Sequence, residues 1–163
     1  MAPILFLNLG GVCHPTSTQY RFFHGLQHVG PQPFVWADQL QPIAQRWNLS
    51  VVLRSTATLT YGFDVVKGLT PEWLQERIAG ATEDVVRNVS LFDIRVVNTS
   101  FGVITRYIKK HDVTHWVTLS DDARGWPEDP QVRRHLVQCN PAKGLTSSGT
   151  LRKLEEALTE CKP

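Results

Sequence analysis

Short apolar runs closed by glycine or polar residues alternate along this chain with segments whose apolar residues have helical spacing. Three such runs, Ile4 to Leu7, Ser50 to Leu53 and His115 to Leu119, end respectively in Asn-Leu-Gly-Gly, Arg-Ser-Thr and Ser-Asp-Asp. Runs of this length are typical of strands buried on both faces of a parallel sheet. Strands that alternate with helices predict a three-layer α/β domain with a mostly parallel sheet.

The remaining segments complete this pattern. Residues 13–33 are rich in His, Pro, Gly and Gln, and we expect a long surface loop or flap there. Two further strands are expected at 91–97 and 134–139. The expected helices are 36–47, one from Pro71 through Ile78, 101–110, and a C-terminal helix capped by Ser147 or Ser148.

Composition fits one globular domain spanning residues 1–163, because 42% of the residues are hydrophobic and can form a core. Seventeen Lys and Arg against fifteen Asp and Glu give a formal charge of +2, which excludes a polycation or a disordered tail. The distribution is uneven, since no acidic residue precedes Asp38.

Three widely spaced cysteines, Cys13, Cys139 and Cys161, form no Cys-x-x-Cys pair. They indicate neither a disulfide framework nor a zinc site, so we expect a cytoplasmic protein. The apolar start, residues 1–7, is too short for a membrane span or a signal peptide, so no membrane partner is expected.

The ends of the predicted strands are where chemistry is expected. Sites in parallel sheets form beyond the carboxyl ends of the strands, which would bring together residues 8–12, 54–56 and 120–122. Asp121 and Asp122 are adjacent carboxylates of the kind that hold Mg²⁺. Spacing alone favours the simpler alternative, in which the two aspartates cap the following loop and stay solvated.

Four segments resemble the motifs of a known superfamily. Residues 4–15, ILFLNLGGVCHP, resemble the first motif of the haloacid dehalogenase (HAD) superfamily, in which an apolar strand precedes Asp-x-Asp-Gly-Val. VVLRST at 51–56 and WVTLSDD at 116–122 resemble the second and fourth motifs. NPAKGLT at 140–146 resembles the close of the HAD domains associated with Swiss Army Knife RNA repair proteins. The order of these parts, over nearly the whole chain, is more specific than any one motif.

This resemblance implies a Rossmann-like, HAD-like fold with no large cap domain, and a site for phosphoryl transfer. In the family, a first Asp is the nucleophile, a second Asp is the general acid and base, and a Lys balances charge. The second-motif hydroxyl holds phosphate and the fourth-motif acidic pair holds Mg²⁺. Carried over, these roles give Ser55, Thr56 and the adjoining Arg54 as phosphate-binding residues, and Asp121 and Asp122 as metal ligands.

The chain departs from the family pattern at the catalytic positions. Asn8 stands at the nucleophile position, and an amide is not ionised and is a poor nucleophile. Gly10 stands at the acid/base position and has no side chain to move a proton. The lysine expected after residue 98 is replaced by Thr-Ser-Phe, while Lys109 and Lys110 come at the far end of that helix. Such losses cost many orders of magnitude in rate, so standard phosphatase activity is not expected.

Arg54 adjoins the predicted site, which has lost about two negative charges relative to the family pattern. One hypothesis is that Arg54 forms a salt bridge with Asp121 or Asp122 where the metal would bind, so that Mg²⁺ binds weakly. The alternative is a solvated arginine at a strand end. His14 is expected to be structural and Trp126 to be exposed.

We therefore expect a degenerate HAD-like domain that is a binding or interaction module rather than an enzyme. Its partner would be an unknown protein or a phosphate-containing ligand. The alternative is a Mg²⁺-dependent phosphohydrolase of the HAD superfamily that acts on nucleic-acid ends. A charge of +2 gives only weak support for nucleic-acid binding.

Overall fold

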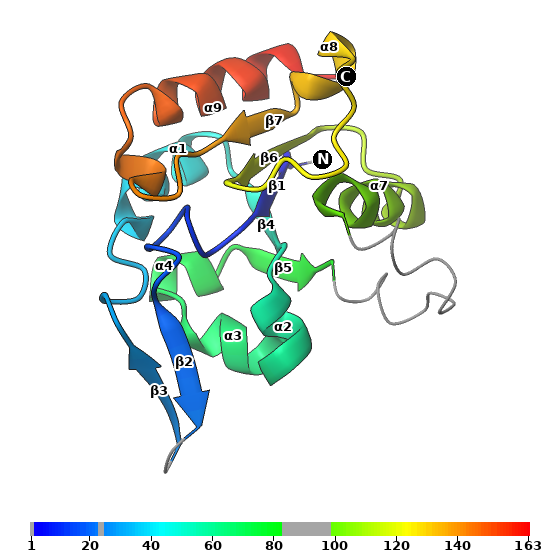
Figure 1. The fold of residues 1–163 in the computed structure, drawn as a ribbon. Coiled ribbons are helices and arrows are strands. Elements are labelled where there is room, and N and C mark those ends of the chain that lie inside the picture. The colour runs from blue at the N-terminus through cyan, green and yellow to red at the C-terminus, as the bar shows by residue number, and fades with distance from the viewer. Residues whose placement is uncertain (1, 23–24, 83–98) are drawn as a thin grey trace.

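A five-stranded sheet forms the centre of the structure, a computed structural model that describes residues 2–22, 25–82 and 99–163. The strand order is β5-β4-β1-β6-β7, and every neighbouring pair is parallel (Figure 1). This arrangement confirms the predicted Rossmann-like α/β class. The strands are β1 (Ile4–Leu7), β4 (Ser50–Leu53), β5 (Ile78–Ala81), β6 (Trp116–Ser120) and β7 (Leu136–Gln138).

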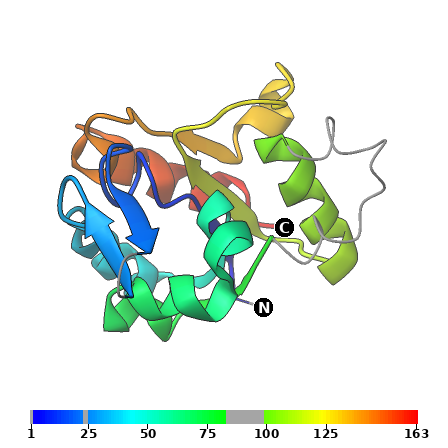
Figure 2. The same ribbon diagram turned by 60° about the horizontal axis from the view of Figure 1, so that its bottom comes forward.

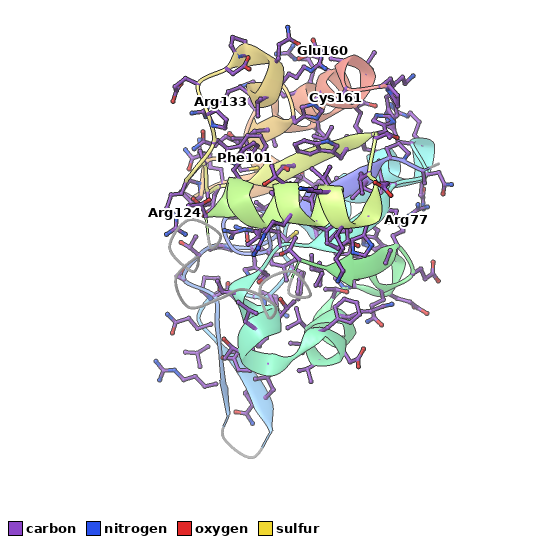
Figure 3. The ribbon with its side chains drawn as sticks, turned by 90° about the vertical axis from the view of Figure 1, so that its right-hand side faces the viewer. Arg77, Phe101, Arg124, Arg133, Glu160 and Cys161 are labelled. Atoms are coloured by element: carbon purple, nitrogen blue, oxygen red, sulfur yellow. The ribbon has the colours of Figure 1, made fainter. Side chains whose placement is uncertain are left out.

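Helices cover both faces of this sheet, which makes three layers. On one face lie α1 (Gln41–Arg46) and α9 (Thr150–Glu160), and on the other lies α7 (Ser100–His111). Figure 3 looks onto α7. The shorter connecting helices are η1 (Ala37–Leu40), α2 (Thr56–Tyr61), α3 (Phe63–Leu69), α4 (Glu72–Gln75), α8 (Pro130–Arg133) and η2 (Gly144–Thr146).

Strand β1 shows how a run without alternating polar residues is buried on both faces of the sheet. Leu5 and Leu7 are fully buried with the residues of α1 and α9, whereas Phe6 is fully buried with those of α7. The Phe6 ring meets the ring of Tyr107 edge-on, with 5.5 Å between centroids. Each such side chain stabilises the fold by roughly 1.5–3 kcal/mol through burial.

The segment expected to be a loop over residues 13–33 contains a β-hairpin, so that expectation was wrong in part. Strands β2 (Gln19–Phe22) and β3 (Leu26–Val29) pair antiparallel, and Tyr20 lies opposite His28. The hairpin extends beyond the sheet on the side of α2 and α3 (Figures 1 and 2). Three of the four β3 residues are exposed, so the segment lacks the apolar alternation that predicts a strand.

The helix that begins after Pro71 is shorter than expected. It ends at Gln75, and Ile78, expected on its apolar face, begins β5 instead. In this strand, Ile-Ala-Gly-Ala, the Tyr107 hydroxyl packs over Gly80 and would lie 3.1 Å from a Cβ added there. Such a sequence has weak strand propensity. The strand expected at 91–97 lies outside the described residues.

The C-terminal elements differ from expectation in their boundaries. Helix α9 begins after Gly149, whose φ of +82° is left-handed, and no side chain caps it, so Ser147 and Ser148 are not its caps. Strand β7 is shorter than 134–139 because Arg134 still closes the turn of α8.

Trp126 is buried, contrary to expectation. It is 5% exposed and packs against Phe101, with 4.9 Å between ring centroids. The loop around it, which contains Gly, Pro and Glu, folds back onto α7, and composition alone does not reveal this.

All three cysteines are buried free thiols. Among residues 2–22, 25–82 and 99–163, no helix is long and apolar enough to cross a membrane.

Candidate functional site

Three strand ends converge at the carboxyl edge of the sheet, as the sequence predicts. Leu7, the last residue of β1, pairs with Leu53 of β4 on one side and Leu119 of β6 on the other. The pairing continues past the strands, since Asn8 N donates to the Leu119 carbonyl at 3.0 Å and Arg54 N donates to the Leu7 carbonyl at 2.8 Å. The β1–β4–β6 edge therefore places Asn8, Arg54 and the acidic pair together.

Asn8 uses its amide as a hydrogen-bond donor. Its Nδ2 donates to Asp121 Oδ1 at 2.6 Å and to the Gly10 carbonyl at 3.1 Å. A hydrogen bond to an ionised acceptor is among the stronger ones in proteins. The position at which the resemblance implies a nucleophilic carboxylate thus carries a neutral donor that contacts Asp121.

The two glycines after Asn8 have different surroundings. Gly11 has a φ of +74°, and a Cβ there would lie 2.4 Å from Asp121 Oδ2, so only glycine permits this close approach. Gly10 has no positive φ, and a Cβ added to it would meet no atom within 4 Å. The acid/base position is therefore open, and its lack of a side chain is not a packing requirement.

Asp122 is held by two arginines. Arg54 contacts Asp122 Oδ2 at 3.2 Å, so the expected salt bridge is present. Arg124 donates from its backbone N and Nε to Oδ1 at 2.9 and 3.0 Å, and from its terminal nitrogen to Oδ2 at 3.0 Å. Arg54 is 8% exposed, whereas the Arg124 side chain is 77% exposed, near Phe101 and the start of α7 (Figure 3).

These contacts set the electrostatics of the site. Burial lowers the pKa of Arg54, although the Asp122 charge opposes this shift. Partial burial works to raise the pKa of Asp122, but the hydrogen bonds from Arg124 and the charge of Arg54 outweigh it and lower the pKa below its ordinary value. Asp122 is therefore an ionised partner of two cations.

The donor set can be compared with what Mg²⁺ requires. HAD domains generally use Mg²⁺, and the ion needs several hard oxygen ligands in octahedral geometry. Here one oxygen of Asp121 accepts from Asn8, and both oxygens of Asp122 accept from arginines. No group of three or more His, Cys, Asp or Glu in the described part of the chain could hold a metal ion. In this arrangement the site does not fit Mg²⁺.

Ser55 and Thr56, the predicted phosphate-binding residues, lie at the start of α2. Ser55 caps this helix, and its Oγ accepts from the backbone N of Ala57 at 3.2 Å. Both residues and Gly10 line a pocket of about 360 Å³. The structure therefore divides the predicted site into a hydroxyl-lined pocket and a charged cluster, Asn8–Arg54–Asp121–Asp122, which meet at Gly10.

His14 supports the fold, as the sequence suggested. Its Nδ1 accepts a hydrogen bond from the backbone N of Phe34 at 3.2 Å, and the two rings pack edge-on at 5.1 Å. Burial lowers the pKa of His14 to about 4, so the ring is neutral at pH 7.

Burial, with the charge of Asp121, raises the pKa of the Cys139 thiol to about 12, so this thiol is not a nucleophile.

The first turn of α7 carries no lysine. Thr99 caps this helix by accepting from Gly102 N at 3.1 Å, while Lys109 and Lys110 occupy its last turn. Sequence reasoning did not predict that Arg124 binds Asp122, for which the Asp-x-Arg spacing was an available signal.

A parallel sheet with an acidic pair after β6, a hydroxyl after β4 and an open turn after β1 defines a HAD-like α/β domain. The chain belongs to the family described as the HAD domain in Swiss Army Knife RNA repair proteins, whose model matches residues 4–149. No curated protein and no solved structure matches the chain.

Proposed function

We propose that this chain is a HAD-family domain that binds a ligand or partner without catalysing phosphoryl transfer. The observation that carries this proposal is the hydrogen bond from Asn8 Nδ2 to Asp121 Oδ1 at 2.6 Å. At the position where the family pattern has a nucleophilic carboxylate, Asn8 is a neutral donor that binds the Asp121 carboxylate.

Phosphoryl transfer by the family mechanism needs a carboxylate that attacks phosphorus and a second group that moves the proton. Asn8 supplies neither charge nor a strong nucleophile, and its amide nitrogen faces Asp121. Gly10 leaves the acid/base position vacant. Removing groups that act together typically lowers the rate by several orders of magnitude.

Weak Mg²⁺ binding follows from the same contacts. An incoming ion would compete with Asn8 for Asp121, and with Arg54 and Arg124 for Asp122. The displaced Arg54 is buried and would lose its carboxylate partner, which is costly. The cluster is therefore better suited to hold the strand ends together than to bind a cation.

A second candidate is a Mg²⁺-dependent phosphohydrolase that acts on nucleic-acid ends. It is supported by the family and by the position of Ser55, Asp121 and Asp122 at one sheet edge. Arg54 and Arg124 would then bind substrate phosphate in addition to their contacts with Asp122. We rank this candidate second, because among the described residues of the site no carboxylate stands at the position expected for the nucleophile.

A phosphatase assay with a generic aryl phosphate and Mg²⁺ tests the proposal. We expect no turnover by the wild type and slow turnover by the double variant Asn8→Asp/Gly10→Asp. The aspartate side chain introduced at residue 10 has space there, because a Cβ at this position meets no atom within 4 Å. Asn8→Asp/Gly10→Ala is the matched control, since it restores the nucleophile without the acid and base. Wild-type activity that Asp121→Ala abolishes would overturn the proposal in favour of the second candidate.

A further inference from the structure

Strand β7 leaves one edge of the central sheet open. It is the last strand in the order β5-β4-β1-β6-β7, and no strand among the described residues pairs with its outer side. A groove of about 300 Å³ lies between this edge and helix α9. Figure 1 shows both elements on the side of the molecule away from the β2–β3 hairpin. An open strand edge can pair with another chain.

The main chain of β7 has hydrogen-bonding groups that face this edge. The His135 carbonyl accepts from β6 at 2.7 Å and Cys139 N donates to β6 at 2.9 Å, so these residues, with Val137 between them, turn toward β6. Alternate residues of a strand point their N–H and C=O groups to opposite sides, so those of Leu136 and Gln138 point outward. A three-residue edge is too short for stable pairing by itself, so the contacts of α9 decide what docks here.

Helix α9 presents a line of charges along the groove. Lys153, Glu156, Ala157 and Glu160 all line it. Their spacing covers almost two helical turns, so they lie on one face of α9. Lys153 and Glu160 are exposed, and neither forms an ion pair within the described part of the chain. Glu160 lies at the outer rim of the molecule (Figure 3). The face is therefore positive near the start of α9 and negative at its end.

This order of charges is complementary to itself. When two copies of α9 pack antiparallel about a two-fold axis between residues 156 and 157, Lys153 faces the partner's Glu160 and Glu160 faces the partner's Lys153. Ala157 at this axis is small and buried, so the two helices can approach closely. Val137, the middle residue of β7, lines the same groove, so one axis can also pair the two β7 edges. A two-fold interface requires such a self-complementary surface.

We propose that β7 and α9 form a two-fold interface between two copies of this chain. The two sheets join edge to edge through β7, and two Lys153–Glu160 pairs set the antiparallel register of the helices. A second copy fits this surface because it brings the same charges in reverse order, whereas a neutral peptide on the edge would leave both charges unmatched. Assembly of this kind is independent of whether the site turns over phosphate.

Charge reversal on α9 tests the interface. Sedimentation over a range of concentrations should show a wild-type dimer with a Kd of about 100 µM or tighter. Lys153→Glu and Glu160→Lys each place like charges at both symmetry-related contacts, and each should weaken the dimer about tenfold or more. The double variant Lys153→Glu/Glu160→Lys restores opposite charges and should return to within about threefold of the wild-type Kd.

Mixing the two single variants tests the pairing most sharply. One variant is acidic at both positions and the other is basic at both, so a mixed dimer has two matched pairs. An equimolar mixture should therefore associate about as tightly as the wild type. Lys109→Glu, a control reversal at an exposed residue of α7 on the opposite face of the sheet, should leave the Kd unchanged.

A strand-edge variant tests the other part of the interface. Gln138→Pro removes an outward N–H without removing a hydrogen bond to β6, and should weaken the dimer about tenfold. Urea unfolding of each variant shows whether it is folded. A wild-type Kd weaker than about 100 µM would overturn the inference. Single reversals that leave the Kd unchanged, a mixture that does not associate, or a dimer unaffected by Gln138→Pro would also overturn it.

Discussion

Two arginines bind the same carboxylate, and only the buried one should matter for stability. Arg54 and Arg124 approach Asp122 Oδ2 at 3.2 and 3.0 Å, but their side chains are 10% and 77% exposed. We therefore expect Arg54→Met and Asp122→Asn to destabilise the fold strongly, and Arg124→Met only slightly.

The magnitude follows from distance and burial. At 3.2 Å and an effective dielectric constant of about 20, the gross attraction between Arg54 and Asp122 is ~5 kcal/mol. Desolvation of the buried partner offsets much of this, so the expected coupling energy is about 2 kcal/mol. Asp122→Asn should cost about 3 kcal/mol, because it leaves Arg54 buried without a counter-charge. The exposed pair formed by Arg124 should contribute less than about 1 kcal/mol.

Urea unfolding of the four proteins in the Arg54→Met and Asp122→Asn double-mutant cycle measures the coupling, with Arg124→Met as the control. The pKa of Asp122 is lowered in the fold, so its contribution should be complete above about pH 4 and lost as the pH falls through that lowered value. A coupling energy below about 0.5 kcal/mol, or equal effects of the two arginine variants, would show that the buried Arg54–Asp122 pair does not stabilise the fold.

Two other predictions concern the glycine turn after β1 and the buried His14. Gly11→Ala should destabilise the fold by about 2–4 kcal/mol, because its backbone is left-handed and the added Cβ would meet Asp121. Gly10→Ala, whose Cβ meets no atom, should stay within about 0.5 kcal/mol of the wild type. Equal urea midpoints for the two variants would contradict this prediction. Burial lowers the pKa of His14 to about 4, so between pH 6.5 and 4 the unfolded chain binds a proton at this residue and the folded chain does not. The free energy of unfolding should therefore fall by up to ~3 kcal/mol as the pH drops through this range. Removal of this histidine by His14→Gln should reduce that slope, whereas His28→Gln, at an exposed position, should not; identical slopes would show that another group is responsible.

The central sheet could be predicted because its strands are buried on both faces. The runs at β1, β4 and β6 are short and almost entirely apolar, and their ends carry the polar residues of the site. Parallel pairing then brings those ends to one edge of the sheet, which is why the sequence alone predicts that Asn8, Arg54 and Asp121 lie close together.

Other features depend on contacts that are distant in sequence. Tyr107 packs over Gly80 of β5, and Trp126 is buried because its loop folds onto Phe101. The hairpin is mostly exposed and is fixed by the hydrogen bond from Tyr61, so its own sequence gives little strand signal. The hydroxyl-lined pocket could not be predicted, because it is lined by the hairpin together with α2 and α3.

Asn8, Arg54 and Arg124 contact the two carboxylates that would bind Mg²⁺, and so should weaken its binding. Calorimetric titration of the wild type with Mg²⁺ tests it most directly, with Asn8→Asp as the comparison. The Asn8→Asp variant places a second carboxylate against Asp121 and should gain Mg²⁺ affinity, because the cation relieves the repulsion between the two charges. We predict no wild-type binding at low-millimolar Mg²⁺ and measurable binding by the variant; low-millimolar or tighter binding to the wild type would contradict the account.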